Sequence, residues 1–246
     1  MSSEHEEFCR RNREMIQKMG ADASLKEASG QLLAQSAVYE YSYHFSWMGR
    51  PIIQFPQDMV AMQEIIWNTR PDLVIETGIA RGGSLIFYAS MLRLLGKGEV
   101  LGIDIDIREH NRVEIENHFL ADAITMIEGS STDPEVFRAV QEFAAGRERI
   151  MVCLDSSHTH DHVLRELKLY SGLVTPGNYL VVFDTVIELL PDHLDVVANR
   201  PWGKGNNPMT AVREFLKESN RFEVDREMED KLLLTAAPGG YLRCIR

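Results

Sequence analysis

Short apolar runs alternate with longer amphipathic segments over most of the chain. The runs are LVIET at 73–77, VLGID at 100–104, ITMIE at 124–128, IMVCLD at 150–155 and YLVVFD at 179–184. Near-continuous apolar runs of this kind are typical of parallel strands that are buried on both faces. Each of the first four is followed by a segment of helical character, as in successive βαβ units. We therefore predict an α/β fold built on a doubly wound, Rossmann-like parallel sheet.

The two ends of the chain follow other patterns. A charged, amphipathic segment at the start predicts a helix, and FPQDMVAMQEIIWNTR at 55–70 predicts a second one that leads into the core. Pro56 suits the first turn of that helix, and Pro71 lies just beyond its end. Near the other terminus, FEVD at 222–225, KLLLTAA at 231–237 and a Pro-Gly-Gly turn before YLRCIR predict an antiparallel hairpin at one edge of the sheet.

An aromatic segment without a clear period lies between the opening helix and the first strand. It contains Tyr39, Tyr41, Tyr43, His44, Phe45 and Trp47. We interpret residues 1–56 as an N-terminal extension, a helix followed by an aromatic lid, and residues 57–246 as one ligand-binding domain. No linker-like stretch or internal repeat divides that domain.

Composition narrows the class of protein. The 246 residues are 44% hydrophobic, enough for one large core, and the net charge of −11 argues against a nucleic-acid partner. Cys9, Cys153 and Cys244 are far apart and form no Cys-x-x-Cys pair, so neither a disulfide framework nor a cysteine-ligated zinc site is expected. Neither a membrane span nor a signal peptide is apparent. We expect a cytoplasmic protein with no membrane partner, and a homo-oligomer.

The first strand runs into a glycine-rich turn, Glu76 to Ser84, which opens a helix. Such turns let the backbone approach a ligand closely. A dinucleotide fingerprint requires Gly-x-Gly-x-x-Gly, but Ala80 occupies the second glycine position and Glu76 ends the strand. A carboxylate there would repel a pyrophosphate and attract the sulfonium and ammonium of S-adenosylmethionine. The charge pattern therefore favours S-adenosylmethionine over a nicotinamide cofactor.

Two later turns complete a predicted nucleoside site. Asp104 ends the second strand, where a doubly wound fold places the carboxylate that accepts ribose hydroxyls, and Gly129 to Ser131 would lie against adenine. In the alternative interpretation, the glycines only turn the chain and Asp104 caps a helix. The candidate cofactor residues are Glu76, Gly78, Ala80, Arg81, Gly82, Ser84, Asp104, Ser130, Ser131 and Asp155.

Four stretches resemble one known family: SYHFSWMGRPIIQFPQD (42–58), RPDLVIETGIARGGSLIFYAS (70–90), LDSSHTHDHVLRELKLYSGLVTPGNYLVVFDT (154–185) and RPWGKGNNPMTAV (200–212). The chain resembles the cephalosporin hydroxylase and rhamnosyl O-methyltransferase family over nearly everything after residue 40. It is more distantly similar to catechol-type O-methyltransferases. The resemblance implies a class I methyltransferase fold, S-adenosylmethionine, frequent Mg²⁺ dependence and hydroxyl substrates on sugars or natural products. The hydroxylase label fits poorly, since the residues form neither an iron facial triad nor a flavin fingerprint.

Two aspartates are the predicted metal ligands. Asp155 and Asp184 close strands that should be neighbours, so their carboxylates open into one crevice and could hold Mg²⁺. Metal-dependent relatives usually carry an acidic residue immediately before the second carboxylate, where this chain has Phe183. Glu188 and Asp161 are candidates to compensate. A metal-free site in which Asp184 caps a helix stays open.

His158 is the predicted general base, with Asp155 as the other catalytic candidate. It lies three residues after Asp155, where catechol-type relatives place the catalytic lysine, and histidine side chains titrate near neutral pH. A solvated helix start is the alternative interpretation. Because a helical pattern follows, only His158 and His162 of the nearby histidines could align, so zinc is not expected. His44, His160 and His193 are the remaining candidates for the base.

The sequence therefore predicts an S-adenosylmethionine-dependent O-methyltransferase. Its acceptor would be a hydroxyl of a small molecule, a sugar or a natural-product intermediate, covered by the aromatic segment and by residues 200–208, unless these segments are oligomer contacts. A catalytically silent cofactor-binding partner of another biosynthetic enzyme is the main alternative. A nicotinamide-dependent oxidoreductase is the other, although Glu76 and Ala80 argue against it.

Overall fold

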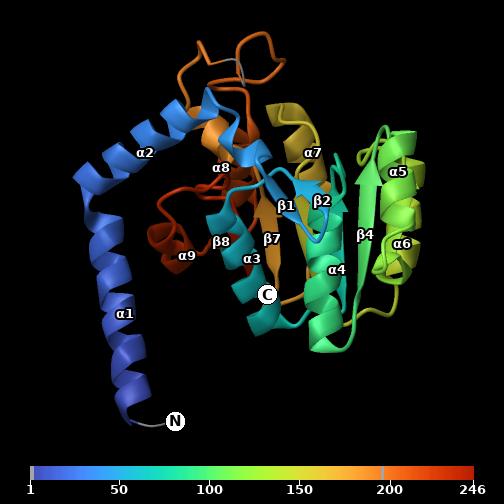
Figure 1. Cartoon of the computed structure of the whole chain (residues 1–246), viewed down its shortest axis with the longest axis horizontal. Coiled ribbons are helices and arrows are strands. Elements are labelled where there is room, and N and C mark those ends of the chain that lie inside the picture. The colour runs from blue at the N-terminus through green and yellow to red at the C-terminus, as the bar shows by residue number, and fades with distance from the viewer. Residues whose placement is uncertain (1–2, 195–196) are drawn as a thin grey trace.

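A seven-stranded sheet lies at the centre of the computed structural model, which describes residues 3–194 and 197–246 (Figure 1). Its order is β5-β4-β3-β6-β7-β9-β8, with β5, β4, β3, β6 and β7 parallel and β9 antiparallel to both of its neighbours. The strands are β3 (Leu73–Thr77), β4 (Glu99–Asp104), β5 (Ile124–Glu128), β6 (Ile150–Leu154), β7 (Tyr179–Val182), β8 (Phe222–Val224) and β9 (Tyr241–Cys244).

Helices cover both faces of this sheet, which confirms the predicted doubly wound α/β fold. One buried cluster joins the sheet to α3 (Pro56–Thr69), α4 (Gly83–Leu95) and α5 (Glu109–Glu116). The other joins it to α6 (Pro134–Ala144), α7 (His160–Tyr170) and α8 (Pro208–Glu218). Short 3₁₀ turns, η2 (Ala121–Ala123) and η3 (Thr185–Leu189), precede β5 and follow β7.

The predicted strands agree closely with the observed ones, and their ends are informative. β3 and β5 match the predicted runs, whereas β6 ends at Leu154 and β7 at Val182. Asp155, Phe183 and Asp184 therefore follow their strands. Asp184 adopts a left-handed conformation with φ of 55°, which is uncommon for a residue with a side chain. Such backbone conformations often mark functional sites.

Two helix starts show why local sequence decides their position. α3 begins at Pro56 and ends at Thr69, as predicted, and Arg70 closes it in a left-handed conformation. α8 begins at Pro208 after a capping box. The Asn207 side chain accepts a hydrogen bond from Thr210 N, and the Thr210 hydroxyl oxygen accepts one from Asn207 N. These contacts satisfy amide groups that a helix start leaves unpaired.

The C-terminal antiparallel pair is confirmed, but the segment between its strands differs from the expectation. Residues 231–237 form no strand: α9 (Arg226–Lys231) includes the first of them, and the rest are irregular. The buried Asp58 carboxylate then accepts hydrogen bonds from Thr235 Oγ1 at 2.5 Å and Ala236 N at 2.8 Å. The segment is thus tied to α3, and β8 pairs with β9 instead.

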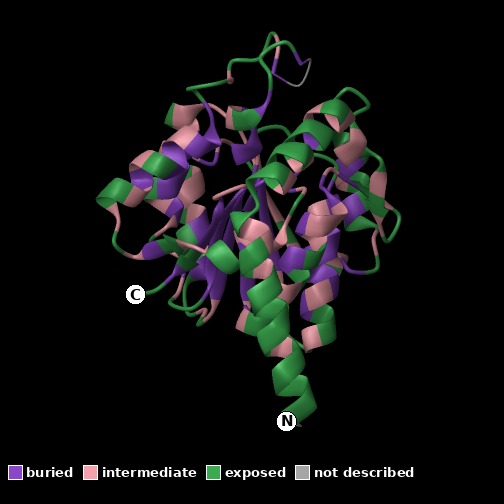
Figure 2. Cartoon of the chain, turned by 90° about the vertical axis from the view of Figure 1, so that its left-hand side faces the viewer, coloured by how far each residue is buried: buried purple, intermediate pink, exposed green. Residues whose placement is uncertain are grey.

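The N-terminal extension contains α1 (Ser3–Ala21), α2 (Ala23–Ala37), η1 (Tyr41–Tyr43) and the hairpin of β1 (Phe45–Trp47) and β2 (Arg50–Ile52). α1 buries none of its residues and projects from the body (Figure 2), whereas Leu33, Ile52 and Phe55 join the core. The division at residues 56 and 57 stays a prediction. In the described part of the chain, every helix is too short or too polar to cross a membrane.

Candidate functional site

A cavity of about 1270 Å³ lies at the carboxyl ends of the parallel strands. Residues that follow β3, β4, β5, β6 and β7 all line it. This is the point where β3 lies between β4 and β6 and the strand order reverses, which is the usual ligand site of doubly wound sheets. Single-ligand pockets are commonly about 300–1,000 Å³, so this cavity has room for a cofactor and an acceptor.

The glycine-rich turn is built for close approach. Gly78 has φ of +90°, and a Cβ there would lie 2.0 Å from the Asp155 carbonyl oxygen, so only glycine fits. Asp104 Oδ2 accepts hydrogen bonds from Ile79 N at 2.7 Å and Ala80 N at 3.3 Å. Gly78, Ala80 and Asp104 line the cavity. The Asp104 carboxylate thus fixes the turn while bordering the cavity.

Glu76 lies beneath this turn and does not line the cavity. The sequence predicts direct contact between its carboxylate and a ligand, whereas the structure places the carboxylate behind the turn. Its side chain is fully buried, and Oε2 accepts a hydrogen bond of 2.6 Å from Ser84 Oγ. Oε1 is buried with no hydrogen-bond partner within 3.5 Å among the described residues, and the Tyr88 side chain is the neighbour that acts on the carboxyl besides Ser84. Burial raises the pKa of Glu76 to about 8, with a further increase from the charge of Asp104, although the Ser84 hydrogen bond opposes the shift.

Arg81 and Gly82 were expected to bind the cofactor, but they lie outside the cavity lining. The Arg81 side chain is exposed, and the backbone carbonyl oxygen of Arg81 accepts hydrogen bonds from the Arg50 guanidinium. Gly82 caps α4 with φ of +81°, and a Cβ there would lie 2.3 Å from Ile115 Cδ1. The geometry gives these two residues a role in shaping the turn.

Ser130 and Ser131 line the cavity after β5, as the nucleoside interpretation expects. Ser131 is held from α7: its Oγ lies 3.2 Å from His162 Nε2, and its carbonyl accepts a hydrogen bond of 2.9 Å from the Tyr170 hydroxyl. Glu166 is fully buried on the same face of α7 and accepts a hydrogen bond of 2.8 Å from Ser156 Oγ. Sequence reasoning missed this polar face, although the spacing of 162, 166 and 170 could have indicated it.

Asp155, His158 and Asp184 also line the cavity and meet in one cluster. One ligand atom from each lies within 4.8 Å of the others, and His158 Nε2 is 3.1 Å from Asp184 Oδ2. Burial, and then the nearby charge of Asp184, raise the pKa of Asp155 well above its usual range. Two adjacent carboxylates and an imidazole fit a divalent cation, which would relieve the repulsion between the carboxylates.

The residues proposed to compensate for Phe183 do not join this cluster. Glu188 accepts hydrogen bonds from Gly205 N at 2.8 Å and Asn207 Nδ2 at 2.5 Å, and Asp161 is exposed on the first turn of α7. Phe183 itself is 2% exposed and belongs to the core cluster. Among the described residues, His158 is therefore the third potential ligand beside the two aspartates.

The other histidines diverge from His158. His160 Nδ1 lies 2.8 Å from Thr210 Oγ1 and its Nε2 lies 3.3 Å from Glu214 Oε2, whereas His162 faces Ser131. His193 is exposed at the mouth of the cavity, and His44 does not line it.

The aromatic lid is divided between the cavity and the core. Tyr41 and Tyr43 line the cavity, but Trp47 donates a hydrogen bond of 3.0 Å to Ser90 Oγ and packs against Phe87. Trp202 lines the cavity from the loop before α8. Both predicted covering segments thus reach the cavity.

Comparison with known proteins decides the family. A family model described as Rhamnosyl O-methyltransferase/CmcI matches residues 39–245. The chain belongs to this family. It is 33% identical over 203 residues to a Mycobacterium tuberculosis protein named rhamnosyl O-methyltransferase, covering 80% of this chain and 77% of that one. The Mycobacterium leprae protein of the same name is 33% identical over 202 residues, covering 80% and 82%.

Solved structures of the family show the same fold. A CmcI structure with Mg and SAM has a TM-score of 0.58 and 19% sequence identity, covering 83% of this chain and 78% of that one. Family and fold confirm the expectation of an S-adenosylmethionine-dependent O-methyltransferase. The nicotinamide-dependent and catalytically silent alternatives are not supported.

Proposed function

We propose that this chain transfers a methyl group from S-adenosylmethionine to a hydroxyl of a small molecule, a sugar or a natural-product intermediate. One observation carries the proposal: the same cavity joins a nucleoside-type floor, made by Gly78, Asp104 and Ser131, to the His158–Asp184 pair. The floor suits the cofactor, and the pair suits removal of a proton from an acceptor. The names of the curated relatives support a sugar hydroxyl as the first acceptor to test.

The two ends of the cofactor would use different groups of the cavity. We assign the ribose hydroxyls to Asp104 and the adenine to the turn that carries Ser130 and Ser131. Asp155 adjoins both Gly78 of this floor and His158, so its carboxylate would face the positively charged methionine end of the cofactor. Glu76 would support the turn from below and add negative charge there.

Methyl transfer needs an aligned hydroxyl and a proton acceptor. S-adenosylmethionine supplies a methyl carbon activated by the sulfonium, so most of the protein's work is alignment. The acceptor hydroxyl would donate its proton to His158, whose Nε2 lies 3.1 Å from Asp184 Oδ2. Asp184 would also accept a hydrogen bond from the imidazolium that results.

A divalent cation fits the same cluster. Asp155 and Asp184, with His158 beside them, would hold Mg²⁺, which would lower the proton affinity of a bound acceptor hydroxyl. The cytoplasmic location and the homo-oligomeric state expected from the sequence stay predictions.

Replacing Asp104 by alanine tests the cofactor site. We expect the dissociation constant of S-adenosylhomocysteine, measured by calorimetry, to rise roughly 10- to 100-fold, since charge-assisted hydrogen bonds contribute about 1.5–3 kcal/mol. The variant loses the ribose acceptor and the clasp on Ile79 N. Asp106→Ala is the matched control, because Asp106 is an exposed carboxylate two residues away. Equal affinity in both variants would reject the assigned site.

Glu76→Gln tests the buried acid beneath the turn. Because the pKa of Glu76 is raised from 4.5 to about 8, its stabilising contribution is present below pH 4.5 and is lost as the pH rises to 8. Glutamine does not titrate. In thermal scans without ligand, we expect the melting temperature of Glu76→Gln to match that of the wild type near pH 5 and to exceed it increasingly up to pH 8. The control Glu142→Gln, at an exposed position on α6, should follow the wild-type curve at every pH. If Glu76→Gln also follows that curve, the buried charge of Glu76 does not destabilise the folded protein.

A further inference from the structure

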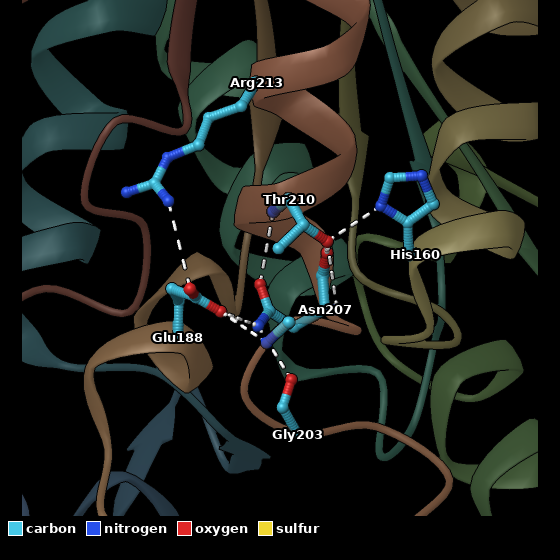
Figure 3. A network of polar contacts seen from close by, with 7 residues as sticks. His160, Glu188, Gly203, Asn207, Thr210 and Arg213 are labelled. Carbon is cyan, nitrogen blue, oxygen red and sulfur yellow. Dashed lines mark hydrogen bonds and ion pairs between the residues drawn. The ribbon is translucent and has the colours of Figure 1, made fainter.

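A tight turn at residues 203–207 lies beside the proton-transfer pair. Gly203 and Asn206 exchange two backbone hydrogen bonds of 3.0 Å, and Gly205 has φ of +82°. The Glu188 carboxylate is the hub of the turn, since it accepts hydrogen bonds from Gly205 N and Asn207 Nδ2 (Figure 3). Asn207 Nδ2 also donates to the Gly203 carbonyl at 2.8 Å. Loop residues rarely have this many fixed partners.

The turn is attached to both segments that carry the pair. Glu188 lies on η3, which begins directly after Asp184. On the other side, Asn206 Oδ1 accepts a hydrogen bond of 2.9 Å from His160 N, two residues after His158. His160 is bonded in turn to Thr210 of α8 (Figure 3). The position of the turn is therefore set by the ends of both β6 and β7.

Trp202 immediately precedes this turn and contacts His158 directly. The two ring centroids are 4.7 Å apart with an interplanar angle of 80°, which is an edge-to-face contact. The Arg200 guanidinium carbon lies over the same indole, 5.6 Å from the Trp202 ring centroid. The His158 imidazole is thus held between the Asp184 carboxylate and the indole.

We propose that Trp202 is a positioning residue that fixes the orientation of the His158 imidazole, and that the 203–207 turn holds Trp202 in place. This inference rests on the proposed function, because it takes His158 as the proton acceptor. The hydrogen bond to Asp184 alone leaves the imidazole free to rotate about that contact. The edge-to-face contact with the indole removes this freedom, and proton transfer depends steeply on such geometry.

The test compares Trp202→Ala, Trp202→Phe and the control Trp67→Ala, whose tryptophan is 55% exposed on α3. For Trp202→Ala we expect kcat to fall roughly 10- to 100-fold, the range that a misplacement of about 1 Å can cost. The KM of the acceptor and the affinity for S-adenosylhomocysteine should change little. Trp202→Phe should restore kcat to within about threefold, because a smaller ring keeps the edge-to-face contact.

A spectroscopic readout follows the same contact without turnover. In protein labelled with ¹³C-histidine, the His158 Hε1 resonance should shift in Trp202→Ala, because the ring current of the indole is lost, and stay unchanged in Trp67→Ala. Glu188→Gln weakens the hub of the turn while keeping Trp202, so a smaller shift in the same direction is expected.

Three outcomes would overturn the proposal: an unmoved His158 resonance, an unchanged kcat in Trp202→Ala, or an effect confined to the KM of the acceptor. The last would make Trp202 a wall of the acceptor site. If the wild-type protein methylates no hydroxyl, the proposed function fails separately, and the resonance still reports whether Trp202 holds His158.

Discussion

Replacing His158 by alanine is expected to lower kcat by on the order of 10²- to 10³-fold, as when a positioned general base is removed. The affinity for S-adenosylhomocysteine should stay within about twofold, because the floor of the nucleoside site lies on the other strands. The physical reason is geometric. Of the described histidines, only His158 reaches the aspartate pair, with its Nε2 3.1 Å from Asp184.

The measurement needs steady-state kinetics together with calorimetry of cofactor binding. His110→Ala is a matched control, because His110 is exposed on α5 and does not line the cavity. A kcat near the wild-type value in His158→Ala would reject the role and direct attention to His193 at the cavity mouth. A parallel loss of cofactor affinity would indicate damage to the site as a whole.

Asp155→Asn is expected to lower kcat by on the order of 10³-fold and, in EDTA, to raise the melting temperature above that of the wild type by several degrees. Both effects have one cause. Burial and Asp184 raise the pKa of Asp155, so its charge is unfavourable in the folded protein without a cation. Asparagine removes that charge and also removes a ligand of the proposed Mg²⁺.

Thermal scans with and without Mg²⁺ separate these effects. Added Mg²⁺ should raise the melting temperature of the wild type and of Asp161→Asn, whose aspartate is exposed outside the cluster, but not that of Asp155→Asn. Full wild-type activity in excess EDTA would establish a metal-free enzyme. Phe183 would then be the sequence feature that marks metal-free members of the family, and proton removal would depend on His158 alone.

The sequence by itself determined the fold and the cofactor class. Five apolar runs separated by amphipathic segments are a local signal that survives in the tertiary structure, because strands buried on both faces consist mostly of apolar residues. Likewise, Gly78 is required by its own backbone conformation, and Asp104 by its place at a strand end. The local sequence singles these residues out, although the contacts that they make, with Asp155 and Ile79, are tertiary.

Only the tertiary structure decided what shares the cavity. The Glu76 side chain is buried beneath the turn and accepts a hydrogen bond from Ser84 of α4. The glycine-rich motif alone therefore does not decide whether this carboxylate reaches a ligand. Glu188 was a candidate metal ligand, yet the Gly205 amide and the Asn207 side chain occupy its carboxylate. The contact between His158 and Trp202 joins loops 44 positions apart in number. Sequence periodicity predicts which face of an element is buried, but contacts between distant loops depend on where the ends of β6 and β7 place them.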